Sequence, residues 1–268
     1  MSGRRTTESG QARAGGLITG ALITGAGRGL GRALALELGR AGWRLALVAR
    51  SPDELQATAE AVRAAGGQAW ALAADVGDPL PEAARRLTAA AQAVAGPIEL
   101  VIHAAGALGT SGGLAPLMDT DPDELERALQ VNLLGPFRLT RALLGPMLAR
   151  GRGTIVLVSS DAAVEGYPEW GAYGASKAAL EQLGRVWAAE LEGAGIRVLT
   201  VDPGEMDTVL HAEAVPDADR SQLLDPARVA RWLTRLLLAP AGPRNGARLV
   251  APAALLRAKA HPQGTVRA

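Results

Sequence analysis

A tyrosine and a lysine one helical turn apart are the residues of this sequence best suited to proton transfer. Tyr173 and Lys177 lie in the segment YGASK, so a helix there would place the phenol and the ammonium on one face. A nearby positive charge lowers the pKa of a phenol from its ordinary value of about 10, which favours proton transfer near neutral pH. The alternative is an incidental surface pair. However, of 28 Lys and Arg residues only Lys177 and Lys259 are lysines, so a merely solvated charge at position 177 would be expected to be an arginine.

Two further polar residues could serve the same chemistry. Ser160 lies 13 residues before Tyr173, directly after the apolar run 154–159. Ligands of open α/β sheets bind at the carboxyl ends of the strands, where a serine hydroxyl could donate to a substrate carbonyl. Asn132 lies inside an apolar helical stretch. Its alternative explanation is an interior amide whose hydrogen bonds are satisfied and that bends the helix.

A glycine-rich turn near the start of the chain has the form of a dinucleotide-binding loop. The segment TGAGRGLG, from Thr24 to Gly31, follows an apolar run and precedes a helical pattern. Glycines at this point let the backbone turn tightly and approach a pyrophosphate, and the helix N-terminus supplies free N–H groups. The alternative is a glycine-rich turn without a ligand, but its place after a first strand favours the dinucleotide.

Arginines near this turn favour NADP(H) over NAD(H). An acid about 20 residues after the glycines would bind the ribose hydroxyl of NAD, whereas an arginine suits the 2′-phosphate of NADP. Here Ala49 and Arg50 end the second apolar run, the first acid is Asp53 inside the next helical pattern, and Arg28 adds a second positive charge. The alternative is that Arg50 is an exposed loop residue.

Apolar runs alternate with helical patterns along the chain. The predicted strands are residues 21–24, 44–49, 68–73, 100–103, 154–159, 197–201 and 248–250, and the predicted helices are 30–41, 51–65, 81–95 and a longer one from 121 toward 150 that Gly135-Pro136 would kink. Most strands are continuous apolar runs, which is typical of parallel sheets buried on both faces. This order predicts an α/β fold, a doubly wound Rossmann-type parallel sheet of about seven strands flanked by helices. We expect a flexible leader at 1–16 and a single domain at 17–268.

Composition excludes several classes of function. A formal net charge of +1 argues against a nucleic-acid partner, and the absence of cysteine excludes disulfides, thiolate nucleophiles and Cys-ligated metals. Three scattered histidines make a metal site unexpected. The apolar stretches are too short for a membrane span, which needs about 20 residues, and residues 1–16 do not resemble a signal peptide. We therefore expect a cytoplasmic protein without a membrane partner.

Together these motifs resemble the short-chain dehydrogenase/reductase family, in its single-domain branch, from about residue 17 to 251. TGxxxGxG matches Thr24–Gly31, YxxxK matches Tyr173–Lys177, and the family's serine, helix asparagine, acid and PG motif match at Ser160, Asn132, Asp75 and Pro203-Gly204. The resemblance implies Tyr173 as general acid/base, Lys177 to lower its pKa and hold the ribose, Ser160 to orient the carbonyl, and Asn132 to support a proton relay. The cofactor-binding residues that it implies are Gly25, Arg28, Gly29, Leu30, Gly31, Arg50, Asp75, Val76, Ala105, Gly106, Tyr173, Lys177, Pro203, Gly204 and Thr208. It also implies a homodimer or homotetramer.

The sequence departs from the family pattern at two places. The family's NNAG segment is His103-Ala104-Ala105-Gly106 here, so we expect His103 to replace the first asparagine structurally, with a role near the adenosine as the alternative. Glu205 and Asp207 follow the PG motif and either repel anionic substrates or cap the next helix. We expect substrate specificity in the loop 205–224. The candidate substrate contacts are Val164, Tyr167, Trp170, Met206, Leu210 and His211.

These features predict an NADP(H)-dependent oxidoreductase acting on a small carbonyl compound or secondary alcohol. An alternative from another class is a catalytically silent dinucleotide-binding sensor or scaffold of the same fold, which would have no evident need for Ser160, Tyr173 and Lys177 together. A third hypothesis is a related lyase or epimerase that uses hydride only transiently. Such enzymes usually have a longer C-terminal substrate region, whereas 60 residues follow Thr208 here.

Overall fold

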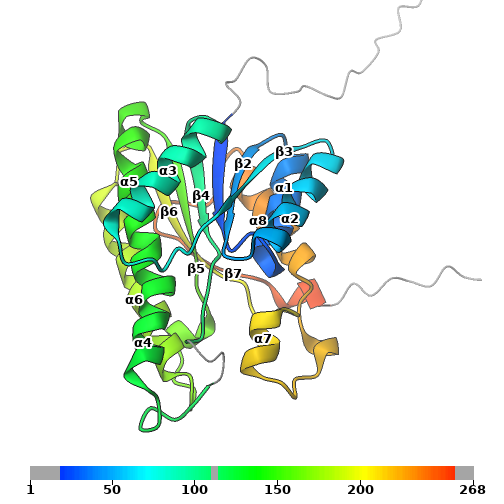
Figure 1. The fold of residues 1–268 in the computed structure, drawn as a ribbon, viewed down its shortest axis with the longest axis vertical. Coiled ribbons are helices and arrows are strands. Elements are labelled where there is room, and N and C mark those ends of the chain that lie inside the picture. The colour runs from blue at the N-terminus through cyan, green and yellow to red at the C-terminus, as the bar shows by residue number, and fades with distance from the viewer. Residues whose placement is uncertain (1–18, 110–113, 257–268) are drawn as a thin grey trace, which may run out of the picture.

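A parallel sheet of seven strands lies between two layers of helices (Figure 1) in the computed structural model, which describes residues 19–109 and 114–256. The strands are β1 (Gly20–Thr24), β2 (Arg44–Ala49), β3 (Gln68–Ala73), β4 (Ile98–His103), β5 (Gly153–Val158), β6 (Ile196–Asp202) and β7 (Arg248–Val250). Their order is β3-β2-β1-β4-β5-β6-β7, and every neighbouring pair is parallel. The chain winds outward from β1 to β3 and then returns to β4. The predicted doubly wound sheet is therefore confirmed, and its switch point lies between β1 and β4.

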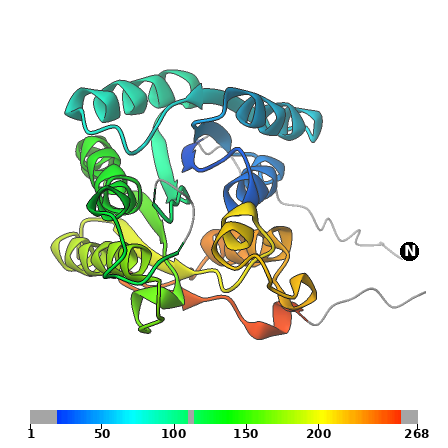
Figure 2. The same cartoon turned by 60° about the horizontal axis from the view of Figure 1, so that its bottom comes forward.

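The helices cover both faces of the sheet. They are α1 (Gly29–Arg40), α2 (Pro52–Ala64), α3 (Pro81–Ala95), α4 (Pro122–Leu129), α5 (Gly135–Arg150), α6 (Gly171–Glu190), α7 (Val209–Ala214) and α8 (Pro226–Leu238). α1, α2 and α8 pack on one face, and α3, α5 and α6 on the other, as Figure 2 shows from below. Successive residues of β1 separate the two cores, because Leu22 packs with α3 and α5 while Ile23 packs with α1 and α8. This is why the strand sequences are apolar without alternation.

Capping side chains mark the start of two helices. The Ser51 hydroxyl accepts a hydrogen bond from the Glu54 N–H at 3.4 Å, and Pro52 is the first residue of α2. The Asp121 carboxylate accepts from the Asp123 N–H at 2.9 Å at the start of α4.

The long helix predicted from residue 121 to 150 is interrupted earlier than expected. The structure places a π-helical turn at Gln130–Leu134, between α4 and α5, whereas the sequence predicts a kink at Gly135-Pro136. Pro136 instead lies in the first turn of α5. Because proline has no N–H, Pro136 cannot donate to the preceding turn, and the change in hydrogen bonding therefore falls on the residues before it. Asn132 lies in the middle of this π-helical turn.

The loop at 205–224 contains structure of its own. It includes α7 and a short 3-10 turn at Arg220–Gln222, and Met206 pairs with Leu224 in an isolated bridge. The Thr208 side chain lies close to the backbone of Gly29, so this loop reaches the glycine turn before α1 (Figure 2). The predicted leader at residues 1–16 lies outside the described residues.

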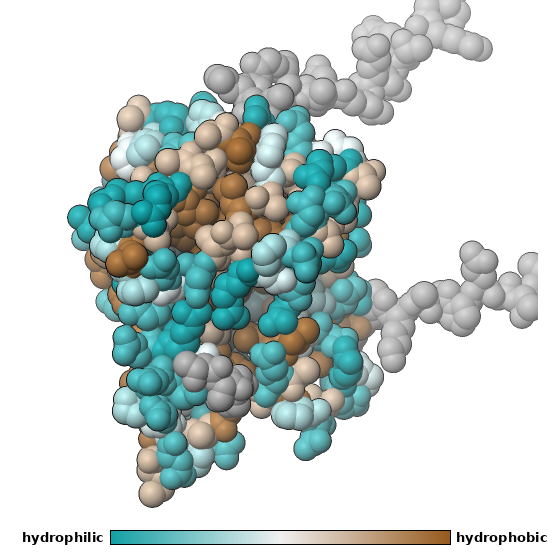
Figure 3. All heavy atoms as spheres, viewed as in Figure 1, coloured by the Kyte–Doolittle hydropathy of each residue, from teal (hydrophilic) through white to brown (hydrophobic). Residues whose placement is uncertain are grey.

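The surface seen in Figure 3 is largely hydrophilic, with brown residues gathered in its upper part. A groove between β3, α3 and α5 is lined in part by Ala71, Leu72 and Leu87, because β3 is an edge strand that the helices cover incompletely. Within residues 19–109 and 114–256, no helix combines the length and the apolar character that crossing a bilayer requires.

Gly31 provides a test of backbone packing in the glycine turn. A methyl group at this position would collide with the Gly25 carbonyl oxygen, whereas at Gly145 in α5 it would meet no described atom within 4 Å. We expect Gly31→Ala to lower the free energy of unfolding by about 1–3 kcal/mol, because the backbone would have to shift. We expect the control Gly145→Ala to raise it by about 0.5–1 kcal/mol, as alanine favours helix. Urea denaturation measures both, and equal stability of Gly31→Ala and the wild type would contradict this packing.

Candidate active site

Tyr173 and Lys177 lie one turn apart on α6, and both side chains are buried. They are 7% and 3% exposed. The Lys177 Nζ donates to the carbonyl oxygen of Val158 at 2.8 Å, so the end of β5 fixes the ammonium. The same nitrogen lies 5.5 Å from the centroid of the Tyr173 ring, and Trp170 packs edge-to-face on that ring at 5.6 Å. Both proton-transfer candidates therefore have defined positions out of bulk water.

Burial shifts the pKa of each group toward its uncharged form. It lowers the pKa of Lys177 to about 8. It also raises the pKa of Tyr173 above its ordinary value; the hydrogen bond with Ser160 opposes this increase, and the charges of Asp161 and Asp202 add to it. The sequence-based expectation of a lowered Tyr173 pKa differs from this result, because desolvation of the phenolate dominates.

The catalytic candidate Ser160 follows β5 and has an acidic neighbour that the sequence analysis did not single out. The Ser160 hydroxyl donates to the Asp161 carboxylate at 2.8 Å and accepts from the Ala162 N–H at 3.2 Å. The Tyr167 hydroxyl donates to the other Asp161 oxygen at 3.1 Å. A serine hydroxyl has one proton and two lone pairs, so with the proton directed at Asp161 and one lone pair at the Ala162 N–H, one lone pair of Ser160 remains for a further donor. The signal available in the sequence was an acid directly after the serine.

Asn132 is completely buried and connects three segments of the site. Its Oδ1 accepts from the Ala107 N–H at 2.9 Å, and its Nδ2 donates to the Ala107 carbonyl at 2.8 Å and to the Ser176 hydroxyl at 2.9 Å. The amide side chain is thus fully engaged in structure, as the alternative explanation proposes. Pro136 has no N–H to donate to the Asn132 carbonyl, so that oxygen lacks the ordinary α-helical partner.

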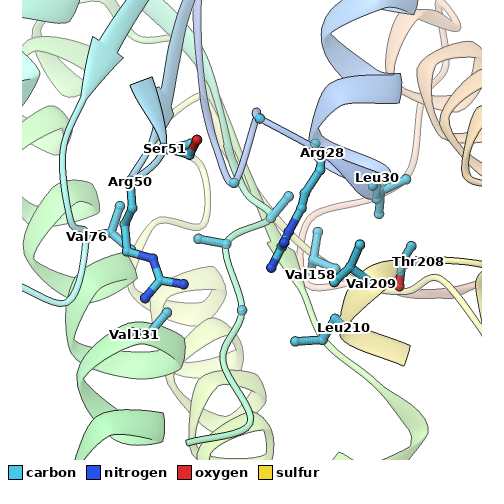
Figure 4. Close-up of a pocket in the computed structure, with 18 of the residues that line it drawn as sticks. Arg28, Leu30, Arg50, Ser51, Val76, Val131, Val158, Thr208, Val209 and Leu210 are labelled. Carbon is cyan, nitrogen blue, oxygen red and sulfur yellow. The ribbon is translucent and has the colours of Figure 1, made fainter. Parts of the chain in front are cut away.

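A cavity of about 560 Å³ opens at the carboxyl ends of the strands (Figure 4). Fourteen of the fifteen predicted cofactor-binding residues line it, the exception being Gly204. Those that line it are Gly25, Arg28, Gly29, Leu30, Gly31, Arg50, Asp75, Val76, Ala105, Gly106, Tyr173, Lys177, Pro203 and Thr208. The structure therefore brings the glycine turn, both arginines and the Tyr173–Lys177 pair to one cavity.

Of the predicted substrate contacts, Met206 and Leu210 line this cavity, and four others do not. Val164 and Tyr167 are 58% and 44% exposed on the segment between Ser160 and α6. Trp170 packs on Tyr173, and the His211 Nε2 lies 4.0 Å from the Glu205 carboxylate. None of these four side chains forms the wall of the main cavity.

The glycine turn is tied to the end of β4 by close backbone contacts. Gly25 has a φ of 67°, and a Cβ at this residue would lie 2.7 Å from the Ala105 nitrogen. The Ala105 N–H donates to the Thr24 hydroxyl at 3.2 Å. Only glycine fits this backbone conformation and spacing, so the turn can pack directly against the segment that follows β4.

Charged side chains at the glycine end of the cavity have partners in the structure. Figure 4 shows the Arg28 and Arg50 side chains reaching into the cavity from two sides. Arg28 lies 4.0 Å from the Glu54 carboxylate and 3.9 Å from that of Glu213 on α7. Asp75 binds Arg127 at 2.8 Å and accepts from the Gly77 N–H. Any ligand contact by Asp75 must therefore be made beside this ion pair.

The two acids after the PG motif do not cap the following helix. Thr208 caps α7, since its hydroxyl accepts from the His211 N–H at 3.2 Å. Asp207 pairs with Arg220, whose Nε donates to it at 2.9 Å, and Glu205 is 73% exposed in its side chain. The capping alternative for Glu205 and Asp207 is therefore wrong.

His103 is buried at the end of β4, where the family resemblance places an asparagine. Its Nε2 lies 2.9 Å from the Thr140 hydroxyl on α5, and its Nδ1 has no partner within the described part of the chain. Burial, with a contribution from Lys177, lowers the pKa of His103 to about 3, so the ring is neutral at pH 7. Its contact links β4 to α5, in keeping with a structural replacement.

Comparisons with known proteins agree on one family. A family model described as short chain dehydrogenase matches residues 19–219. A short chain dehydrogenase of Pseudocercospora fijiensis is 33% identical over 78% of this chain and 67% of its own length. Versicolorin reductase 1 of Aspergillus parasiticus is 33% identical over 81% of this chain and 82% of its own. The crystal structure of a short chain dehydrogenase of Shigella flexneri complexed with NADP superposes with a TM-score of 0.80 and 29% identity, over 87% and 96% of the two chains.

The neutral His103 predicts that the fold loses stability in mildly acidic solution. Its pKa falls from about 6.5 in the unfolded chain to about 3 in the fold, so between these values the unfolded chain binds more protons. The contribution is complete above about pH 6.5 and is lost as the pH falls toward 3, by up to about 1.4 kcal/mol per pH unit. We expect His103→Asn to lose less stability than the wild type between pH 7 and 5 in urea denaturation. His211→Asn controls for the loss of a histidine, and an unchanged pH dependence in His103→Asn would contradict this assignment.

Proposed function

The chain belongs to the short-chain dehydrogenase/reductase family, and we propose that it is an NADP(H)-dependent oxidoreductase that acts on a carbonyl compound or secondary alcohol. The observation that carries the proposal is that Tyr173 and Lys177 line the same cavity as the glycine turn. Tyr173, which can transfer a proton, thus lies in the same cavity as the glycine turn, whose main chain is suited to binding phosphates. When bound, the cofactor supplies or accepts hydride at its nicotinamide ring, and the protein contributes position and electrostatics.

The glycine turn fits a pyrophosphate. A Cβ at Gly31 would collide with the Gly25 carbonyl oxygen inside the turn, so only a glycine lets the main chain turn this tightly at the N-terminus of α1. The free N–H groups of a helix N-terminus favour an anion. The NADP complex of the Shigella flexneri relative supports a nicotinamide dinucleotide in this place.

The preference for NADP(H) rests on Arg28 and Arg50. Both line the cavity, and Ala49, which lines it as well, offers no carboxylate to a ribose hydroxyl. Two guanidinium groups suit a 2′-phosphate, since arginine donates bidentate hydrogen bonds to phosphate. Glu54 and Glu213, about 4 Å from Arg28, hold its side chain at the edge of the cavity.

Tyr173 is assigned the proton transfer. Burial keeps its phenol protonated near neutral pH, which suits donation to a carbonyl oxygen as the carbonyl is reduced and acceptance of the proton in the reverse direction. Lys177, held by the Val158 carbonyl, places a positive charge beside the ring and can hold a ribose hydroxyl. The Asn132 carbonyl, four residues before a proline that has no N–H, is assigned to a water-linked relay toward Lys177.

Ser160 is assigned to orient the substrate carbonyl. Its hydroxyl is held by Asp161, so the substrate oxygen and this carboxylate compete for one proton. The substrate would enter between Met206 and Leu210 and the segment that bears Tyr167 and Trp170. A homodimer or homotetramer and a cytoplasmic location stay predictions.

Removal of the Tyr173 hydroxyl tests the assigned mechanism. We expect Tyr173→Phe to lower kcat by at least about 100-fold, which is typical of a lost general acid, while the Kd for NADPH stays within about threefold. The ring and its contact with Trp170 are kept, so the fold should be unaffected. Oxidation of NADPH with a panel of ketones and aldehydes measures turnover. Full turnover by Tyr173→Phe would contradict the proton transfer assigned to Tyr173.

The wild type in the same assay separates the alternatives. NADPH binding without turnover of any carbonyl or alcohol would favour the silent sensor or scaffold. Conversion of a substrate without net redox change would favour the lyase or epimerase.

Cofactor preference is tested by titration with NADPH and NADH, read by calorimetry. We expect tighter binding of NADPH, and Arg50→Ala and Arg28→Ala should each raise its Kd about tenfold or more, the worth of a charge-assisted hydrogen bond. The Kd for NADH should change little, since NADH has no 2′-phosphate. Arg32→Ala is the matched control, because Arg32 is exposed on α1 and does not line the cavity. Tighter binding of NADH by the wild type would contradict the proposed role of both arginines.

A further inference from the structure

A buried group of three charged side chains and one serine lies next to Ser160. It consists of Ser159, Glu181, Asp202 and Arg248, here named the Arg248 cluster. The first three are 2%, 2% and 5% exposed, and the Arg248 side chain is 29% exposed. Charges are seldom buried to this degree unless they are paired, so the arrangement of the pairs has to be specific.

One guanidinium group connects three segments of the chain. The Arg248 Nε donates to the Glu181 Oε1 at 3.0 Å. Its Nη2 donates to the Asp202 Oδ2 and to the Ser160 main-chain carbonyl, both at 3.2 Å. Arg248 therefore contacts α6 through Glu181, the end of β6 through Asp202 and the main chain of Ser160.

The two carboxylates extend these contacts to the walls of the site. Glu181, one turn after Lys177 on α6, also accepts at its Oε1 from the Ser159 hydroxyl at 2.7 Å. Ser159 directly precedes Ser160 in the chain. Asp202 Oδ1 accepts from the Gly204 N–H at 3.0 Å, which holds the turn after Pro203. Within the described chain, Arg185 is a second cation at Glu181, at 3.5 Å and 58% exposed, so Arg248 is the closer counter-charge.

We propose that Arg248 is a positioning residue for the active site, which holds the segment of Ser160, after β5, at its spacing from the Pro203-Gly204 turn after β6. The inference rests on the proposed function and deepens it. Neither β7 nor Arg248 touches the main cavity, so Arg248 acts only through the groups that it binds. This geometry requires an arginine, because one guanidinium group donates to Glu181 from Nε and to Asp202 and the Ser160 carbonyl from Nη2.

The expected effect falls on turnover and leaves cofactor binding nearly unchanged. Arg248→Met keeps the length of the side chain and removes all three hydrogen bonds. We expect kcat to fall about 10- to 100-fold while the Kd for NADPH stays within about threefold, because the glycine turn and Arg50 hold the other end of the cofactor. Arg248→Lys, which keeps the charge but lacks the guanidinium fork, should recover kcat only in part.

Arg152→Met is the matched control. Arg152 also makes a close ion pair, with its Nε 2.6 Å from Glu99. It lies at the amino end of β5, whereas the site lies at the carboxyl ends of the strands. We expect its kcat and its Kd for NADPH to equal those of the wild type within twofold. An equal loss of kcat in Arg152→Met would show a general effect of lost ion pairs and would overturn the proposal.

Two outcomes are distinguished by the wild-type assay. A folded Arg248→Met with kcat within twofold of an active wild type overturns this inference alone. A wild type without NADPH-dependent turnover of any carbonyl compound overturns the proposed function and this inference with it. If Arg248→Met does not fold, Glu181→Gln decides, because it keeps the side-chain size and the acceptor oxygen; a kcat reduced about fivefold is expected, and an unchanged kcat overturns the proposal.

Discussion

A parallel sheet that is buried on both faces leaves only its strand ends for polar groups. The strands of this protein are apolar runs covered by α1, α2 and α8 on one side and by α3, α5 and α6 on the other. Polar chemistry can therefore collect only where the strands end, and all strands end at the same edge because all run the same way. The cavity, the glycine turn and the Tyr173–Lys177 pair all follow from this constraint.

Main-chain groups at this edge satisfy the buried polar side chains. The Val158 carbonyl holds the Lys177 ammonium, the Ala107 amide holds Asn132, and the Ala105 N–H holds the Thr24 hydroxyl. An unpaired buried polar group is costly, so each of these side chains is fixed by a backbone that the sheet itself makes rigid. The site is thus preorganised by the same hydrogen bonds that stabilise the fold.

Local pattern predicts elements well and misses contacts between them. The ranges of β2, β3, β7 and α3 agree with the sequence-based prediction, because apolar runs mark the three strands and a proline marks the start of α3. The interruption before α5 is predicted at Gly135-Pro136 but lies at Gln130–Leu134, since the missing proline N–H acts on the preceding turn. The capping of α7 by Thr208, where Glu205 or Asp207 was an alternative, likewise depends on how the loop folds back.

The sequence alone determines the fold class, the family and most of the residues that line the cavity, because motif spacing and hydrophobic periodicity are local properties. Only the tertiary structure decides the raised pKa of Tyr173, which comes from desolvation, and the hold of Asp161 on the Ser160 proton. It alone also assembles the Arg248 cluster, in which Arg248 binds the carbonyl of a residue 88 positions earlier. Burial and contacts between distant segments have no signature in a local pattern, since they exist only once the sheet has brought its strand ends together.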